Sequence, residues 1–206
     1  VDILSALNID DTSSSYRKID FNSFEGFKNS TKNDLTFIYD DYDISEVEIK
    51  AKGIIISNKR KDKSKLDDVV KFEVPDVLSS VAKISNLFYR DFHNIENKQF
   101  RKAKICLGSN ISKTAIIKNG CEIGDNFSIG DGSVISEGCV IGKNVKIGSN
   151  TLIQNSIIGD NIQIEHNCSI GQPGFGFAFN DNNNLKIFHI GRVIIQDSSY
   201  IGSNCT

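Results

Sequence analysis

Isoleucine recurs at every sixth position through the second half of the sequence, and this spacing constrains the fold more than any other feature. After one step of five residues the series continues, and it reappears near the end of the chain: Ile105, Ile111, Ile117, Ile123, Ile129, Ile135, Ile141, Ile147 and Ile153, then Ile158, Ile164 and Ile170, then Ile195 and Ile201. An α-helix repeats every 3.6 residues and a strand every two, so neither produces a strict period of six. A parallel β-helix with one hexapeptide per strand and turn does produce it, with three hexads per coil.

A second position of the hexad, two residues before each isoleucine, holds mostly small side chains that fit where a chain turns a corner. Four of the five cysteines occupy it, so we expect Cys121, Cys139, Cys168 and Cys205 to fill the core, whereas Cys106 lies outside this phase. The odd total and the lack of a C-x-x-C pair argue against a disulfide framework or a zinc site, which favours a reducing cytoplasm. Glycine often follows the isoleucine, where a Cβ would obstruct the backbone's conformation or clearance.

The periodicity changes before Ile105. Apolar runs at 34–38 and 53–57 predict short buried strands, and apolar residues at helical spacing predict a helix within 74–91 that starts near Pro75. We therefore expect a small α/β domain over residues 1–100, followed by an incomplete β-helix over 101–206. The charged stretch 58–65 predicts a solvated loop, with contact to an acidic partner as the alternative.

Composition excludes several classes of protein. A formal net charge of −2 leaves no basic excess for nucleic-acid binding. No apolar run reaches the roughly 18 residues that a membrane-spanning helix needs. The first residue is Val1 and no secretory leader precedes the first domain, so we expect a cytoplasmic protein with a trimmed N-terminus.

The hexads stop at Gly171 and restart near Val193, leaving an inserted loop at 171–192. Insertions in a solenoid fall on one face, often the binding face. The glycines of this insert do not open a helix after a strand and are not followed by Gly-Lys-Ser/Thr, so they do not form a phosphate loop.

Two groups of residues carry a resemblance to a known family. One is in the insert, Gly174-Phe175-Gly176-Phe177 with Lys186-Ile187 and Ile190-Gly191-Arg192-Val193; the other is Asp34-Leu35-Thr36-Phe37 with Ala51-Lys52-Gly53-Ile54-Ile55-Ile56-Ser57. Together they resemble the UDP-3-O-acylglucosamine N-acyltransferases of lipid A biosynthesis, over nearly all 206 residues. The resemblance implies a left-handed β-helix, a uridine-binding N-terminal domain, and a homotrimer with active sites in grooves between neighbouring prisms. It also implies transfer of a 3-hydroxyacyl group from acyl carrier protein to the 2-amino group of UDP-3-O-acylglucosamine, in the cytoplasm or at the inner-membrane surface.

The resemblance also implies the substrate-binding residues. Phe37 matches the aromatic residue that stacks on uracil, Asp40 stands where the family has Asn, and Tyr42 or Tyr39 replaces the next aromatic residue. In the insert the expected substrate contacts are Gly174, Phe175, Gly176, Phe177, Lys186 and His189. No cofactor and no metal are expected.

The catalytic base is expected to lie outside this sequence. In the family a His-Asn hexad after the insert supplies it, and those coils would follow Thr206, so we expect a chain truncated within its β-helix. His166 has the same hexad phase but precedes the insert, which makes it a weak candidate. Alternation along a strand predicts that Glu165 points away from His166 and does not orient it.

Two other readings stay open. The chain could be another hexapeptide sugar acyltransferase that uses acetyl-CoA, although the uridine domain and the phenylalanine-rich insert argue against it. It could also be a non-catalytic binding protein that keeps the prism. A β-helical carbonic anhydrase needs three converging histidines, and the three in this chain are scattered.

Overall fold

The computed structural model describes residues 3–9, 19–45, 48–66, 68–89, 101–179 and 184–206. The chain divides into two compact units, Val1–His93 with Phe175–His189, and Asn94–Gly174 with Ile190–Thr206. Most of the insert thus belongs to the first unit. Within the described ranges no helix is long and apolar enough to cross a membrane.

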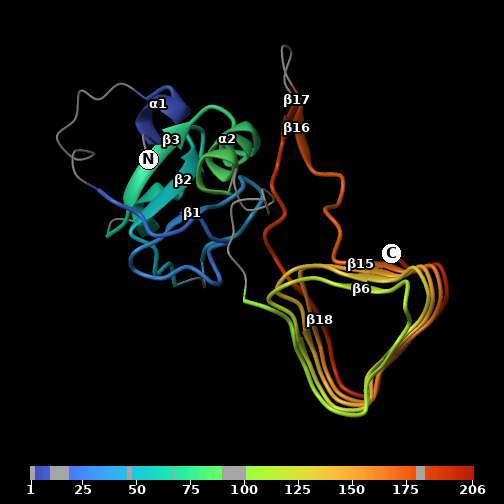
Figure 1. Ribbon diagram of the computed structural model, residues 1–206. Helices are drawn as coiled ribbons and strands as arrows, with labels where there is room; N and C mark the ends of the chain where they lie inside the picture. The colour runs from blue at the N-terminus through green and yellow to red at the C-terminus, as the bar shows by residue number, and fades with distance from the viewer. Residues whose placement is uncertain (1–2, 10–18, 46–47, 67, 90–100, 180–183) are drawn as a thin grey trace. The chain divides into compact units, whose positions relative to one another are not determined.

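A three-stranded parallel sheet organises the first unit (Figure 1). Its order is β1 (Leu35–Phe37), β2 (Gly53–Ser57), β3 (Val70–Val74), so the apolar central strand is hydrogen-bonded on both sides. Ile55 packs into one cluster with residues of α1 (Ile3–Leu7) and α2 (Val77–Tyr89), whereas Ile54 and Ile56 pack into a second cluster with Leu66 of the 3-10 helix η1 (Lys63–Leu66). Burial on both faces explains why β2 is a continuous apolar run.

Helix α2 (Val77–Tyr89) begins directly after Pro75 and Asp76, as the sequence predicted, and strand β3 ends at Val74. The Asp76 carboxylate caps the helix by accepting hydrogen bonds from the backbone N–H groups of Leu78 at 3.0 Å and Ser79 at 3.3 Å. Residues 90–100, which include the expected end of the helix and of the first domain, lie outside the described residues.

The insert is more than a loop. It contains an antiparallel hairpin of β16 (Phe177–Phe179) and β17 (Asn184–Lys186) that packs on α2. The Asn86 amide donates to the Lys186 carbonyl at 3.0 Å, and the Phe188 N–H donates to the Ser85 hydroxyl at 3.4 Å. Ala178, in the middle of β16, is fully buried.

The second unit is a parallel β-helix, as the hexads predicted (Figure 1). Its first face contains β4 (Lys104–Ile105), β7 (Glu122–Ile123), β10 (Val140–Ile141), β13 (Ser156–Ile158) and β18 (Val193–Ile195). Its second face contains β5 (Asn110–Ile111), β8 (Ser128–Ile129), β11 (Lys146–Ile147), β14 (Gln163–Ile164) and β19 (Tyr200–Ile201). Its third face contains β6 (Ile116–Ile117), β9 (Val134–Ile135), β12 (Leu152–Ile153) and β15 (Ser169–Ile170).

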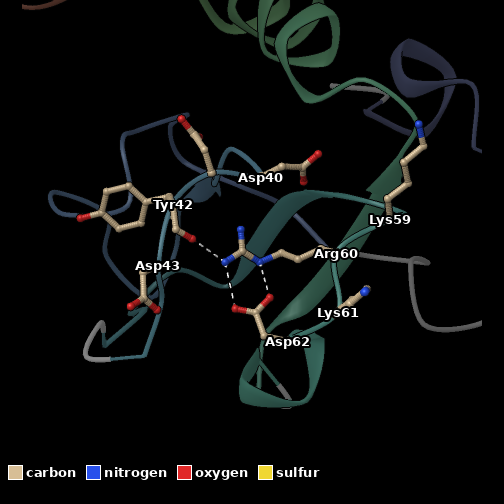
Figure 2. A pocket seen from close by; sticks show the side chains of 8 residues that line it. Asp40, Tyr42, Asp43, Lys59, Arg60, Lys61 and Asp62 are labelled. Atoms are coloured by element: carbon tan, nitrogen blue, oxygen red, sulfur yellow. Dashed lines mark hydrogen bonds and ion pairs between the residues drawn. The ribbon is translucent and has the colours of Figure 1, made fainter.

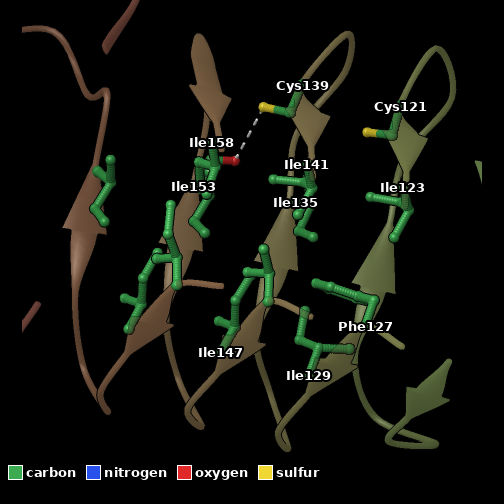
Figure 3. Packing of buried hydrophobic residues seen from close by; sticks show 14 of the residues in the cluster. Cys121, Ile123, Phe127, Ile129, Ile135, Cys139, Ile141, Ile147, Ile153 and Ile158 are labelled. Carbon is green, nitrogen blue, oxygen red and sulfur yellow. Dashed lines mark hydrogen bonds between the residues drawn. The ribbon is translucent and has the colours of Figure 1, made fainter. Parts of the chain in front are cut away.

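The isoleucines stack inside the prism in register from coil to coil (Figure 3). Ile141 pairs with Ile123 below it and with Ile158 above it, and after the insert Ile195 continues the same column. Phe127 is the largest fully buried side chain of the unit.

The cysteine prediction is confirmed for three residues and wrong for one. Cys121, Cys139 and Cys168 are buried at the corners, and the Cys121 thiol donates to the Ser136 carbonyl at 3.1 Å. Cys205 is exposed, so it does not fill the core described here.

Glycine after the inward isoleucine provides clearance between coils. A Cβ on Gly124 would lie 2.6 Å from the carbonyl carbon of Gly142 in the next coil. Left-handed backbone conformations occur elsewhere, at turn residues such as Gly120 (φ 76°) and Asn144 (φ 55°).

Candidate functional site

An apolar pocket of about 290 Å³ lies where β1 ends. Phe37 is the last residue of β1, and Tyr39 and Tyr42 follow in the next turn; Phe27 closes the pocket from another loop. The ring centroids of Phe27 and Tyr42 are 4.7 Å apart, and those of Phe37 and Tyr39 are 5.3 Å apart. Such a group of rings offers apolar faces and edges to a flat ligand. Phe27 had no signal in the sequence, because it lies outside the strand and the turn that carried the resemblance.

A second, charged hollow of about 530 Å³ has residues from the turns after β1 and β2 in its lining (Figure 2). Asp40, Arg60 and Asp62 line it, and Tyr42 lines both hollows. The structure therefore brings Phe37, Asp40 and Tyr42 close together, but Asp40 does not line the apolar pocket. Both hollows lie at the carboxyl ends of parallel strands, which is the edge where open α/β sheets bind ligands.

Burial raises the pKa of Tyr39, and the charge of Asp41 raises it further. The Tyr39 hydroxyl thus stays protonated at neutral pH and keeps its ability to donate a hydrogen bond.

Arg60 is the exception to the solvated loop predicted for residues 58–65. Its side chain is only 4% exposed, and its Nε lies 2.7 Å from Oδ1 of Asp62, although that N–H is not aimed at an acceptor. One Nη donates to the Tyr39 carbonyl at 2.9 Å, and the other donates to the Tyr42 carbonyl at 2.7 Å and to Asp62 at 3.0 Å. The sequence signal for this buried ion pair was an arginine followed two residues later by an aspartate, just after a buried strand.

Asp34, one residue before β1, is a buried carboxylate with a structural role. It accepts hydrogen bonds from the Ser23 hydroxyl at 2.8 Å and from the Thr31 N–H and hydroxyl at 2.7 Å each. Burial opposes its ionisation, but these hydrogen bonds outweigh that effect and hold the pKa of Asp34 below its ordinary value.

The insert presents a second aromatic surface. The rings of Phe175 and Phe177 have centroids 4.9 Å apart, and Phe179 lies 6.2 Å from Phe177. Because side chains alternate along β16, Ala178 is buried while Phe179 is 62% exposed; Phe175, just before the strand, is 85% exposed. Neither of the two hollows described above includes an insert residue.

The remaining insert residues hold the hairpin together. Lys186 pairs with Phe177 across the hairpin. A Cβ on Gly176 would lie 2.5 Å from Nε2 of His189, so the imidazole lies close against this backbone and would have to shift if residue 176 carried a Cβ. Gly174 belongs to the β-helix unit.

His166 lies at a corner of the prism, just after β14. Its Nδ1 accepts a hydrogen bond from the Ser149 N–H at 2.9 Å. A neutral imidazole that accepts at Nδ1 carries its proton on Nε2, a tautomer inferred here from the hydrogen bond. The accessible nitrogen of neutral His166 is therefore a donor and offers no lone pair to a substrate amine.

Glu165 does not point away from His166 as alternation predicted. Its Oε2 lies 4.0 Å from Nε2 of His166, because both residues lie in the corner after β14, where strand alternation no longer applies. Glu165 also accepts from the Gln163 amide at 2.6 Å and from the Tyr200 hydroxyl at 3.0 Å. These two hydrogen bonds lower the pKa of Glu165. Among the described residues, no group of three or more His, Cys, Asp or Glu side chains is arranged to hold a metal ion.

Comparisons with known proteins agree with this architecture. The profile of the family described as the GMPPB C-terminal domain matches residues 105–178. UDP-3-O-acylglucosamine N-acyltransferase of Bradyrhizobium sp. (strain ORS 278) is 46% identical over 57 residues, which are 27% of this chain and 16% of that protein.

The enzymes of the same name from Agrobacterium fabrum and Methylobacterium nodulans are 47% identical over 51 residues and 44% identical over 54 residues. These matches cover 25% and 26% of this chain. The chain matches only about one-seventh of the length of these two relatives, with 14% and 15% of the two proteins covered. The resemblance to UDP-3-O-acylglucosamine N-acyltransferases is therefore confirmed over a limited segment.

Proposed function

We propose that this chain forms part of an N-acyltransferase that moves a 3-hydroxyacyl group from acyl carrier protein to the 2-amino group of UDP-3-O-acylglucosamine, in lipid A biosynthesis in the cytoplasm. The observation that carries the proposal is the 39–47% identity to relatives of that name. The parallel β-helix and the aromatic pocket at the edge of the small sheet are consistent with it.

The N-terminal domain, residues 1–100, is proposed as the uridine-binding domain. Phe37 and Tyr42 supply aromatic faces for the uracil ring, and base stacking on such rings contributes roughly 1–3 kcal/mol per base. Asp40 contacts the nucleotide from the neighbouring charged hollow and accepts hydrogen bonds only, since its carboxylate has no N–H.

The insert is proposed to contact the lipid part of the substrate. Its three phenylalanine rings give a continuous apolar surface, of which Phe175 and Phe179 are largely exposed. Burying such rings against an acyl chain is favourable at about 25 cal/mol per Å² of apolar surface. Gly174, Gly176, Lys186 and His189 complete this substrate-binding group.

The prism is proposed to be left-handed and to assemble as a homotrimer. The outward residues of the third face include Ile116, Val134 and Leu152, whereas the second face presents Asn110, Lys146 and Gln163. An aliphatic face next to a polar one suits closed cyclic association, in which the aliphatic face is covered and the polar face stays in water. The active sites would then lie in grooves between prisms.

Amide formation requires a base for the attacking amine and a donor for the oxyanion. His166 does not fit the first role, because its Nδ1 lone pair accepts the Ser149 N–H. We therefore assign His166 to the corner of the prism and expect the base on a different residue.

The test is a donor and acceptor assay on the full product of the reading frame. With UDP-3-O-acylglucosamine and a 3-hydroxyacyl thioester of acyl carrier protein, mass spectrometry is expected to detect the N-acylated sugar nucleotide. Turnover with acetyl-CoA in place of that thioester would favour another hexapeptide sugar acyltransferase. Nucleotide binding without turnover of either donor would favour a non-catalytic binding protein.

A further inference from the structure

We propose that the Arg60–Asp62 ion pair is a positioning device that holds the turn after β1 in the shape that forms the aromatic pocket. The inference deepens the proposed function, on which it rests for the identity of the ligand, a uracil nucleotide. Arg60 lies in a different loop from the rings it is proposed to position.

The contacts of the Arg60 guanidinium carry the proposal (Figure 2). It reaches from the turn after β2 to the turn after β1 and donates to the carbonyls of Tyr39 and Tyr42, at 2.9 Å and 2.7 Å. The side chains of these same two residues line the aromatic pocket. The guanidinium therefore fixes both ends of the turn that carries two of the four rings.

Asp62 completes the arrangement. It accepts a hydrogen bond from Nη2 at 3.0 Å, and its second oxygen lies 2.7 Å from Nε without a hydrogen bond, so the carboxylate neutralises the buried charge. The turn itself is short, since the Tyr42 N–H donates to the Tyr39 carbonyl at 3.2 Å. The Tyr39 carbonyl thus accepts from Tyr42 and from Arg60 together.

The planar fork explains why arginine is needed. Its separate N–H groups reach two carbonyls and a carboxylate at fixed angles, whereas a lysine ammonium at the same place concentrates its charge at one point. Arg60→Lys therefore keeps the charge but loses the simultaneous contacts, and the rings of Tyr39 and Tyr42 lose their fixed spacing.

Lys63 provides a matched control in the same loop. Its ammonium donates to the Asn58 carbonyl at 2.9 Å and forms an ion pair with Glu73 on β3. It therefore ties the turn after β2 to the sheet without reaching the turn after β1. Lys63→Met tests the loss of a cation from this loop while leaving the Arg60 contacts in place.

The experiment compares wild-type chain, Arg60→Lys, Asp62→Asn and Lys63→Met, with uridine 5′-monophosphate as the probe. Affinity is measured by isothermal titration calorimetry, and exchange of the Tyr42 amide is followed by NMR. We expect Arg60→Lys and Asp62→Asn to weaken binding about tenfold or more and to speed Tyr42 exchange by a similar factor, since the loss of hydrogen bonds to a charged group has effects of this order. Lys63→Met is expected to change both less than twofold.

The outcomes separate this inference from the proposed function. If Arg60→Lys binds the probe as the wild type does and protects the Tyr42 amide equally, the positioning role is overturned. If the wild type does not bind the probe, the uridine assignment fails, and faster Tyr42 exchange in Arg60→Lys but not in Lys63→Met still supports the positioning role. If circular dichroism shows that Arg60→Lys is unfolded, the same two measurements on Asp62→Asn decide whether the positioning role holds.

Discussion

The Asn126 side-chain amide donates a hydrogen bond to Oδ1 of Asn144 in the next coil at 3.1 Å. Asn144 repeats the contact by donating to Asn161 at 3.0 Å. All three residues have left-handed backbone conformations, with φ of 56°, 55° and 57°. Asparagine therefore meets two demands at this corner, because it tolerates the left-handed turn and links successive coils through its amide.

Substitution of Asn144 separates these two demands. Asn144→Gly keeps the left-handed conformation and loses only the amide contacts, which should lower the free energy of unfolding by about 1 kcal/mol. Asn144→Ala also incurs roughly 1–2 kcal/mol of backbone strain. Urea denaturation is expected to rank stability as wild type, then Asn144→Gly, then Asn144→Ala. An alanine variant at least as stable as the glycine variant would show that the turn conformation is not limiting.

Gly124 and Gly26 give a contrasting pair, because only Gly124 faces the backbone of a neighbouring coil. A Cβ at Gly124 meets the backbone of Gly142 at 2.6 Å, whereas a Cβ at Gly26, in a loop of the first unit, meets nothing within 4 Å. In the 206-residue chain, Gly124→Ala is expected to destabilise by about 1–3 kcal/mol through forced separation of coils. Gly26→Ala is expected to lie within about 0.5 kcal/mol of wild type. Equal thermal unfolding temperatures for the two variants would contradict the clearance argument.

The sequence predicted the β-helix because each hexad repeats the same local environment. Ile135 and Ile153 are fully buried at their predicted inward positions, and strands three hexads apart pair as expected. The hairpin in the insert was not predicted from the sequence. In the short strand β16, Phe177 and Phe179 face one side and only Ala178 faces the buried side, so the alternation of apolar and polar residues that indicates a strand is weak.

The candidate site was harder to predict because it depends on contacts between loops. Phe37 and Tyr42 lie in one pocket, as the resemblance implied for uracil-stacking residues. Arg60 stands among charged residues that otherwise indicate a solvated loop, and only the parallel pairing of β1 with β2 brings it to the Tyr39 and Tyr42 carbonyls. The orientation of Glu165 was predicted wrongly, because side chains alternate along a strand and Glu165 lies in the corner after β14.

The lowered pKa of Asp34 predicts a pH-dependent contribution to stability. Its folded value lies below the value of about 3.9 expected in the unfolded chain, so the stabilisation is fully present above that pH. It is lost as the pH falls through the folded value. Asp34→Asn is expected to lose about 1–3 kcal/mol near pH 7. The difference between wild type and variant, measured by denaturation between pH 7 and pH 2, should shrink below about pH 4.

A pH-independent difference for Asp34→Asn would mean that packing, and not the charge, accounts for its effect. Ser23→Ala serves as a control, because it removes one donor to Asp34 at 2.8 Å while the two from Thr31 remain. Ser23→Ala should therefore show part of the loss in free energy of unfolding that is expected for Asp34→Asn.

The cysteines should react with iodoacetamide in an order set by burial. Burial raises the pKa of Cys121 to about 11, so little thiolate forms at pH 8. Cys106 is partly exposed and should be alkylated before the buried Cys121, Cys139 and Cys168. Mass spectrometry of the labelled chain checks this order, and early labelling of Cys121 in folded protein would show that the prism opens at that corner.

Tyr42→Ala tests the aromatic pocket with little disturbance of the core. Phe37 is less suitable for substitution, because its ring packs on Phe24 with the ring centroids 5.3 Å apart. Tyr42 is 37% exposed, and its backbone carbonyl keeps the contact with Arg60 after the substitution. Loss of one stacking ring is expected to weaken binding of uridine 5′-monophosphate by about 1–3 kcal/mol in calorimetry. Phe179→Ala removes an exposed ring of the insert and should leave this affinity unchanged. If instead Phe179→Ala weakens binding and Tyr42→Ala does not, the nucleotide base sits on the hairpin, and the pocket at the end of β1 has another ligand.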